Sequence, residues 1–143
     1  MFKRITLRTA TRQELVNVSD EVRRAVETSG AQEGLCCVYC PHSTAGLVVN
    51  SYLDPMTLRD ITAEVDRLIP TRVDFFHTFD TPSDAAAHVK ATLVGTQQTL
   101  IIHDGKLMLG HSQGILFAEF DGPRDRELYI GVLEGSRDAS VPG

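Results

Sequence analysis

Short stretches near the start of the chain alternate between hydrophobic and polar residues, as strands with one buried face do. Phe2, Ile5 and Leu7 have polar neighbours, which predicts a first strand. Residues 14–18 (ELVNV) predict a second strand. Because the connection around Thr11 is short, the pattern predicts that these two strands form an antiparallel hairpin.

Longer apolar runs follow, and continuous runs of this length are typical of buried strands. Two of them are residues 34–40 (GLCCVYC) and 46–52 (GLVVNSY). Two more are residues 114–121 (GILFAEFD) and 127–135 (ELYIGVLEG). Between them, Asp104-Gly105 separates two apolar runs, and this dipeptide favours a tight hairpin turn.

Three segments carry start and stop signals of helices. Residues 19–30 begin with Ser-Asp, which suits an N-cap, and end at a glycine. Residues 54–70 and 81–95 each have a proline in the first turn. Strands and helices do not alternate regularly, so we expect an α+β fold with a mostly antiparallel two-sheet β-sandwich and about three helices.

The composition is that of one folded domain. The chain has 143 residues, of which 42% are hydrophobic, and a net charge of −5. We therefore expect a single domain over residues 1–143, with a frayed tail from about residue 136. The acidic balance argues against a general nucleic-acid binder. No apolar run could span a bilayer and no signal-peptide core is present, so we expect a cytoplasmic protein without membrane contact.

The three cysteines lie together in the GLCCVYC run. Cys37 and Cys40 have C-x-x-C spacing, which could indicate zinc or redox chemistry, but no second cysteine pair exists. The run is apolar and favours a strand, so we interpret the cysteines as buried structural thiols.

Five histidines are present, without the local spacing of a zinc motif. Asp84 precedes His88 by one helical turn and could orient its imidazole. His42 opens a strand, where it could cap a loop or serve a site. Ser43 follows His42 directly, and adjacent residues of an extended chain point to opposite sides, so these two do not form a catalytic dyad.

A second concentration of polar residues lies in EFDGPRDR. Glu119 lies within an apolar strand, where a carboxylate is unfavourable unless it is paired. Arg124 or Arg126 could be its partner. The segment would then be either a structural salt bridge or a clamp for an anion, because arginine matches phosphate geometry.

Taken together, these motifs resemble the YjbQ family, whose members are often described as secondary thiamine-phosphate synthases. The matching pieces run in the family's order over roughly residues 35–132: PHSTAGLVVN followed by DP, the histidine of FFHTF, SDAAAHVKATLVG, DGKLMLG-x-x-Q and EFDGPRDR. The resemblance implies a small α+β domain that assembles as a homotrimer. It also implies a histidine-lined pocket near a subunit boundary, with His42, His77 and His88 as a candidate metal site.

The activity implied by the resemblance is weak thiamine-phosphate synthase chemistry, in which a thiazole phosphate displaces pyrophosphate from hydroxymethylpyrimidine diphosphate. Such a reaction needs cations around the leaving group, usually a divalent metal, here zinc or magnesium. The candidate catalytic residues are His42, Asp60, His88 and Glu119. The candidate contacts to the small phosphorylated substrate are Ser43, Thr44, Asn50, Lys90, Gln113, Arg124 and Arg126.

Two stretches depart from the family pattern. Ser51 stands where many members have glutamate, and residues 110–113 read Gly-His-Ser-Gln where many have Gly-Thr-Trp-Gln. Three imidazoles also suit zinc better than magnesium. Two further functions are therefore open: metal-dependent hydrolysis at the same residues, and a non-enzymatic trimeric module that binds a ligand or serves in a stress response.

Overall fold

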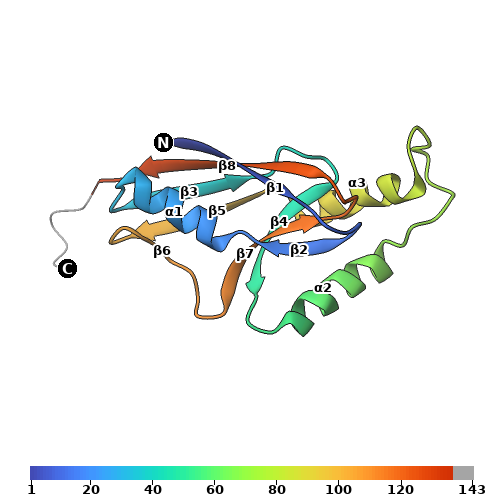
Figure 1. Cartoon of the computed structure of the whole chain (residues 1–143), viewed down its shortest axis with the longest axis horizontal. Coiled ribbons are helices and arrows are strands. Elements are labelled where there is room, and N and C mark those ends of the chain that lie inside the picture. Colours follow the sequence, from blue (N-terminus) through green and yellow to red (C-terminus); the bar gives the residue numbers. More distant parts are fainter. Residues whose placement is uncertain (137–143) are drawn as a thin grey trace.

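The computed structural model describes residues 1–136. Over this range the chain forms three helices and eight strands in two antiparallel sheets (Figure 1). The strands are β1 (Phe2–Arg8), β2 (Glu14–Asn17), β3 (Gly34–Tyr39), β4 (Ala45–Ser51), β5 (Gln97–His103), β6 (Lys106–Leu107), β7 (Gln113–Glu119) and β8 (Asp125–Glu134). The helices are α1 (Ser19–Ser29), α2 (Pro55–Leu68) and α3 (Pro82–Val94). The predicted α+β class with two sheets is confirmed.

The larger sheet has the strand order β1-β8-β3-β5-β6, and the smaller sheet has the order β2-β7-β4. The predicted hairpin of the first two strands is therefore wrong: β1 pairs with β8, and β2 pairs with β7. The chain passes from the larger to the smaller sheet between β1 and β2. Pairing with the long apolar strands β8 and β7 buries more apolar surface than pairing of β1 with β2 in a local hairpin would. The Asp104-Gly105 hairpin between β5 and β6 is confirmed.

The main core lies between the two sheets and α1. It contains apolar side chains of both sheets and of the helix, among them Val22, Val26, Val38, Leu47, Ile115, Phe117, Leu128 and Ile130. A smaller cluster, Ala87, Ala91, Ala118 and Phe120, packs α3 onto the other face of the smaller sheet. Strand β7 is thus covered on both faces, which explains its continuous apolar run.

The helix signals were mostly accurate. α1 ends at Gly30, whose φ of 75° is the left-handed conformation that glycine adopts without strain. The predicted cap at Ser19 is wrong: Val18 is the N-cap residue, and Ser19 Oγ instead accepts a hydrogen bond from the backbone N–H of Ile115. α3 lies close to β4 because Gly46 has no side chain; a Cβ atom there would lie 2.4 Å from the carbonyl oxygen of Gly95.

Both α2 and α3 lie at one end of the molecule, and the connection between them projects beyond the sheets (Figure 1). None of the helices within residues 1–136 is long and apolar enough to cross a membrane. The tail predicted to fray lies almost entirely outside the described residues.

Candidate functional site

The first turn of α3 positions two polar side chains of the site. Thr81 caps the helix, since its Oγ1 atom accepts a hydrogen bond from the backbone N–H of Asp84 at 3.1 Å. Pro82 occupies the first turn, where the missing N–H costs nothing. Asp84 and His88 are one turn apart, and Asp84 Oδ2 lies 3.3 Å from His88 Nε2. The predicted Asp84–His88 pair is confirmed.

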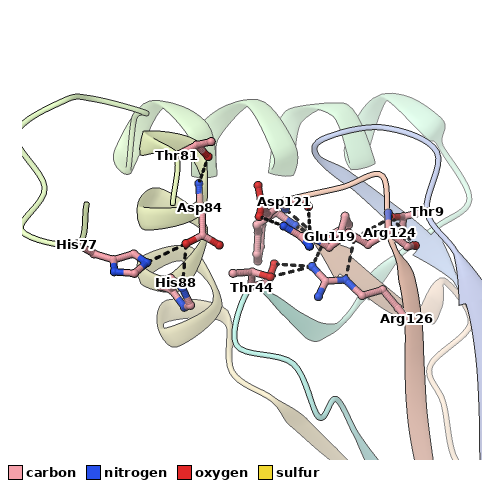
Figure 2. A network of polar contacts seen from close by, with 11 residues as sticks. Thr9, Thr44, His77, Thr81, Asp84, His88, Glu119, Asp121, Arg124 and Arg126 are labelled. Carbon is pink, nitrogen blue, oxygen red and sulfur yellow. Dashed lines mark hydrogen bonds and ion pairs between the residues drawn. The ribbon is translucent and has the colours of Figure 1, made fainter. Parts of the chain in front are cut away.

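His77 reaches the same carboxylate from the connection between α2 and α3. Its Nε2 atom lies 2.9 Å from Asp84 Oδ2. The His77 and His88 rings meet edge to face, with centroids 5.2 Å apart and an interplanar angle of 80°. Figure 2 shows both imidazoles approaching the same oxygen of the Asp84 carboxylate. One ligand atom from each of the three residues lies within 4.8 Å of the other two.

Asp84 is an anion at neutral pH. Burial by itself raises the pKa of Asp84, but the hydrogen bond to His77, the nearby His88 and the interaction with Asp121 outweigh it, so the pKa lies below its usual value. Two imidazoles and one carboxylate form a donor set that suits zinc and other transition metals. Both histidines are partly exposed, so an ion and a substrate can reach them from solvent.

A second polar pair faces Asp84 from the loop between β7 and β8 (Figure 2). Arg124 donates hydrogen bonds to Asp121 twice, from Nε to the backbone oxygen and from an Nη atom to Oδ2, both at 2.7 Å. The Asp121 hydrogen bond, together with the Asp121, Glu119 and Asp84 carboxylates, holds the pKa of Arg124 above its ordinary value. About half of the Arg124 side chain is exposed, which leaves donors free for a phosphate.

The carboxylate of Glu119 is fully buried and belongs to the structural framework behind this pair. It accepts hydrogen bonds from Thr9 Oγ1, from the Arg126 guanidinium and from the backbone N–H groups of Phe120 and Asp121. Burial raises the pKa of Glu119, but these hydrogen bonds outweigh it and hold the pKa below its usual value. Arg126 is therefore the partner of Glu119, and the roles predicted for both in substrate chemistry give way to a structural one.

Thr44 belongs to the same framework. Its Oγ1 atom accepts a hydrogen bond from Arg126 at 2.8 Å, and its side chain is buried. Because these donors and acceptors already have partners, Thr44 and Arg126 are not free to hold a phosphate, contrary to the sequence-based expectation.

His42 lies apart from the other two histidines. Its Nε2 atom accepts a hydrogen bond from the backbone N–H of Glu127 at 2.9 Å, which holds the ring at the start of β8. Burial and the nearby Arg126 charge lower the pKa of His42, so the ring is neutral at pH 7. In a single chain, the predicted trio of His42, His77 and His88 is thus not one ligand group, and Asp84 takes the third place.

The other predicted site residues are scattered over the fold. Lys90 is fully buried on α3 and donates hydrogen bonds to Asp66 Oδ1 and Gln13 Oε1 at 2.6 and 2.9 Å, so it is a structural cation and not a phosphate ligand. Asp60 is exposed on α2, and its side chain makes no hydrogen bond or ion pair with another residue in the range 1–136. Ser43, Asn50 and Gln113 are exposed. The side-chain oxygens of Asn50 and Gln113 accept hydrogen bonds from the backbone N–H groups of Ser51 and Gly110.

The cysteine interpretation is confirmed for Cys36 and Cys40, which are buried and free of disulfides. Burial raises the pKa of each thiol to about 11. A second set of candidate metal ligands, Glu33, His103 and Asp104, lies at the β5–β6 turn. There the two carboxylates approach opposite nitrogens of the imidazole, at 3.0 and 3.6 Å, so they do not converge on one ring atom.

The sequence did not predict that Asp84 contacts His77, nor that Asp121 and Arg124 lie beside it. The spacing of Asp84 and His88 was a visible signal, because four residues are one helical turn. The contact with His77 depends on the course of an irregular 13-residue connection, residues 69–81, for which the sequence carries no periodic pattern.

Comparisons with known proteins identify the family of the chain. A family model described as "UPF0047 protein YjbQ-like" matches residues 3–135. A UPF0047 protein of Methanocaldococcus jannaschii is 41% identical over 133 residues, which cover 93% of this chain and 94% of that protein. The UPF0047 protein YugU of Bacillus subtilis is 35% identical, over 93% and 99% of the two chains.

Solved structures match as well. The crystal structure of a protein of unknown function from Sulfolobus solfataricus, described as "YbjQ-like", has a TM-score of 0.90 and 32% identity, and the match covers 94% of this chain and 97% of that chain. An uncharacterised YjbQ/UPF0047 protein from Clostridium acetobutylicum has a TM-score of 0.87 and 39% identity, over 92% and 99%. These likenesses extend over almost the whole fold, including the elements that carry the site.

Proposed function

The chain belongs to the YjbQ-like UPF0047 family, and on that premise we propose that His77, Asp84 and His88 hold a divalent metal in an enzyme that acts on a small phosphorylated substrate. The observation that carries this proposal is the convergence of two imidazoles on one buried carboxylate, with Arg124 nearby. A bound metal would supply positive charge to a departing or attacked phosphate oxygen.

The reaction that we propose first is thiamine-phosphate synthesis. The ring nitrogen of a thiazole phosphate forms a bond to the methylene carbon of hydroxymethylpyrimidine diphosphate, and the carbon–oxygen bond to pyrophosphate breaks. The leaving pyrophosphate takes the electron pair, so its negative charge must be balanced where it develops. Arg124 is suited to this, since Asp121 fixes its guanidinium while other N–H groups stay accessible.

The donor set gives specific support to a second reaction. Magnesium, the usual partner of pyrophosphate, prefers oxygen ligands, whereas two of the three ligands here are imidazoles. Zinc bound by such a set activates water. Metal-dependent hydrolysis of a phosphate ester or anhydride is therefore the alternative, with the same residues as ligands.

The two reactions are separated by supplying the substrates one at a time. Purified protein is incubated with hydroxymethylpyrimidine diphosphate and zinc or magnesium, with and without the thiazole phosphate, and thiamine phosphate and free pyrophosphate or phosphate are quantified. Thiamine phosphate above the rate without enzyme, lost in His88→Ala and retained in the exposed His111→Ala, supports synthesis. Phosphate release without the thiazole substrate supports hydrolysis. If neither reaction proceeds with either metal, the non-enzymatic module is the remaining function.

The proposal includes the cytoplasmic location expected from the hydrophobic pattern of the sequence and the homotrimer expected from the family resemblance. Exposed apolar side chains support self-association: Val73, Phe76 and Phe79 of the α2–α3 connection are almost wholly exposed in the single chain. Light scattering that gives the mass of one chain would contradict the trimer.

A further inference from the structure

A small cavity adjoins the candidate metal site at His77. It has a volume of about 230 Å³ and is formed by the α2–α3 connection, residues 69–81, and by Pro82 at the start of α3. His77 lines this cavity, and its Nε2 atom contacts Asp84. A ligand held at the metal site can therefore also contact the cavity wall. Pockets for complete ligands have volumes of about 300–1,000 Å³, so this cavity suits one ring of a ligand and not a whole molecule.

Part of the cavity wall is aromatic. The connection has three phenylalanines, of which Phe76 and Phe79 are almost wholly exposed, whereas Phe75 is partly buried and lines the cavity. Arg72 lines it as well, with its Cζ atom 4.7 Å from the centroid of the Phe75 ring. The Nε atom of Arg72 pairs with Asp74 Oδ1 at 3.0 Å, which holds the guanidinium over the ring. Aromatic rings and guanidinium planes both stack on flat groups, so this wall suits a planar ring.

The polar groups of the cavity are free to bind a ligand. Thr78 and Asp80 line the cavity, and within residues 1–136 neither side chain makes a hydrogen bond or ion pair with another residue. An ionised carboxylate only accepts hydrogen bonds, so Asp80 favours a ligand group that carries N–H donors.

The charges of the cavity wall disfavour a phosphate. The Arg72 cation is already paired with Asp74, whereas the Asp80 carboxylate has no cationic partner within the described part of the chain. A phosphate beside Asp80 would be repelled by it. Arg124, whose side chain is half exposed near Asp84, is the better partner for phosphate oxygens.

We propose that this cavity binds the amino-substituted heteroaromatic ring of the substrate, while the phosphates lie at the metal site and Arg124. The inference rests on the proposed function, because it places the other end of the same phosphorylated substrate. The pyrimidine of hydroxymethylpyrimidine diphosphate carries an amino group, which donates to Asp80 while the ring stacks on Phe75. The methylene carbon joins the ring to the diphosphate, so this orientation places the reacting atom between the cavity and the metal ligands. Phe75 and Asp80 are then the residues that determine specificity.

Two probes separate binding of the ring from binding of the phosphates. Isothermal titration with magnesium present compares hydroxymethylpyrimidine diphosphate with inorganic pyrophosphate, which has no ring. We expect Phe75→Leu and Asp80→Ala each to weaken binding of the first probe about tenfold, the effect of losing one stacking surface or one hydrogen bond to a charged group. Pyrophosphate should bind all variants alike. Phe76→Leu, at the neighbouring phenylalanine outside the cavity wall, should change neither affinity.

An analogue of the diphosphate whose amino group is replaced by hydrogen tests the partner of Asp80. The unchanged chain should bind this analogue about tenfold more weakly than the parent compound, and Asp80→Ala should bind the two alike, because both changes remove the same hydrogen bond. Asp80→Ala that still prefers the parent tenfold overturns the role of Asp80. A loss in Phe75→Leu no larger than in Phe76→Leu, or an equal loss for pyrophosphate, overturns the ring site.

The unphosphorylated hydroxymethylpyrimidine distinguishes failure of the cavity from failure of the reaction. Its binding without metal is followed by saturation-transfer nuclear magnetic resonance, and it should be retained in Asp84→Asn and reduced in Phe75→Leu. This result in a chain without turnover would count against the proposed reaction only, and the ring site would stand. Turnover that is unchanged in both Phe75→Leu and Asp80→Ala, with no binding of the unphosphorylated ring, would overturn the ring site and leave the reaction intact.

Discussion

His77 and Asp84 meet at 2.9 Å although they belong to different elements, an irregular connection and the first turn of α3. The carboxylate is nearly buried while the imidazole is partly exposed, so the pair has one fixed side and one side open to solvent. With His88 on the same carboxylate oxygen, the group can exchange its internal hydrogen bonds for a shared cation. This geometry makes Asp84 the residue on which the site depends most.

We predict that Asp84→Asn weakens zinc binding by about 10- to 100-fold, because the change removes the anionic ligand and the partner of both imidazoles. Asparagine has almost the same size, so packing at the start of α3 is retained. Isothermal titration with zinc at pH 7 measures the effect, and His111→Ala, which changes an exposed histidine on the β6–β7 turn, is the matched control. Equal zinc affinity in Asp84→Asn and in the unchanged chain would contradict the proposed site.

The buried pair of Glu119 and Arg126 should act on stability. Glu119→Gln leaves the Arg126 charge buried without its partner, which costs about 3–5 kcal/mol of unfolding free energy. The double variant Glu119→Gln/Arg126→Met removes the uncompensated charge and should recover part of this loss. Urea unfolding at one fixed protein concentration measures both. A double variant as unstable as Glu119→Gln alone would show that the charge is not the cause.

The Glu119–Arg126 pair also makes the unfolding free energy depend on pH, and the direction follows from the pKa of Glu119. The pKa of Glu119 is lower in the folded chain than its ordinary value, so the unfolded chain binds this proton more readily. The contribution of Glu119 is therefore complete at neutral pH and is lost as the pH falls through the folded-state pKa. Glu119→Gln should flatten the acid side of the stability profile.

Local signals predicted the helices, because caps and proline positions act within one turn. Asp54 accepts a hydrogen bond from the Met56 N–H before Pro55 starts α2, and Thr81 does the same for α3. The Asp84–His88 pair could be predicted for the same reason. Strand partners could not, since β1 pairs with β8 across more than 110 residues of sequence. The residues of Glu119's network, such as Thr9 and Arg126, meet only through this non-local pairing.

The family resemblance grouped His42, His77 and His88. In the single chain, only His77 and His88 lie together. The Glu127 N–H binds His42 Nε2, and this contact arises from the position of β8, which the local sequence around residue 42 does not encode. His77 and His88 meet because the α2–α3 connection turns back onto α3. The sequence pattern alone therefore indicated the Asp84–His88 pair on one helix, whereas the family resemblance correctly grouped His77 with His88 and wrongly added His42.

The neutral state of His42 gives a second pH prediction. Its pKa is lowered in the folded chain, so the unfolded chain takes up this proton first as the pH falls below the ordinary value of 6.5. The stability contributed by neutral His42 is complete above that pH and declines between it and the folded-state pKa. His42→Gln keeps a side-chain acceptor for the Glu127 N–H and cannot titrate. Its unfolding free energy should change less between pH 7.5 and 5.5, measured by urea unfolding.

Nuclear magnetic resonance titration checks the same point directly. The signal of the His42 ring should shift with a midpoint below the ordinary pKa of 6.5, and His42→Gln identifies this signal by its loss. A His42 titration at or above pH 6.5 would contradict the assignment of a neutral, hydrogen-bonded ring.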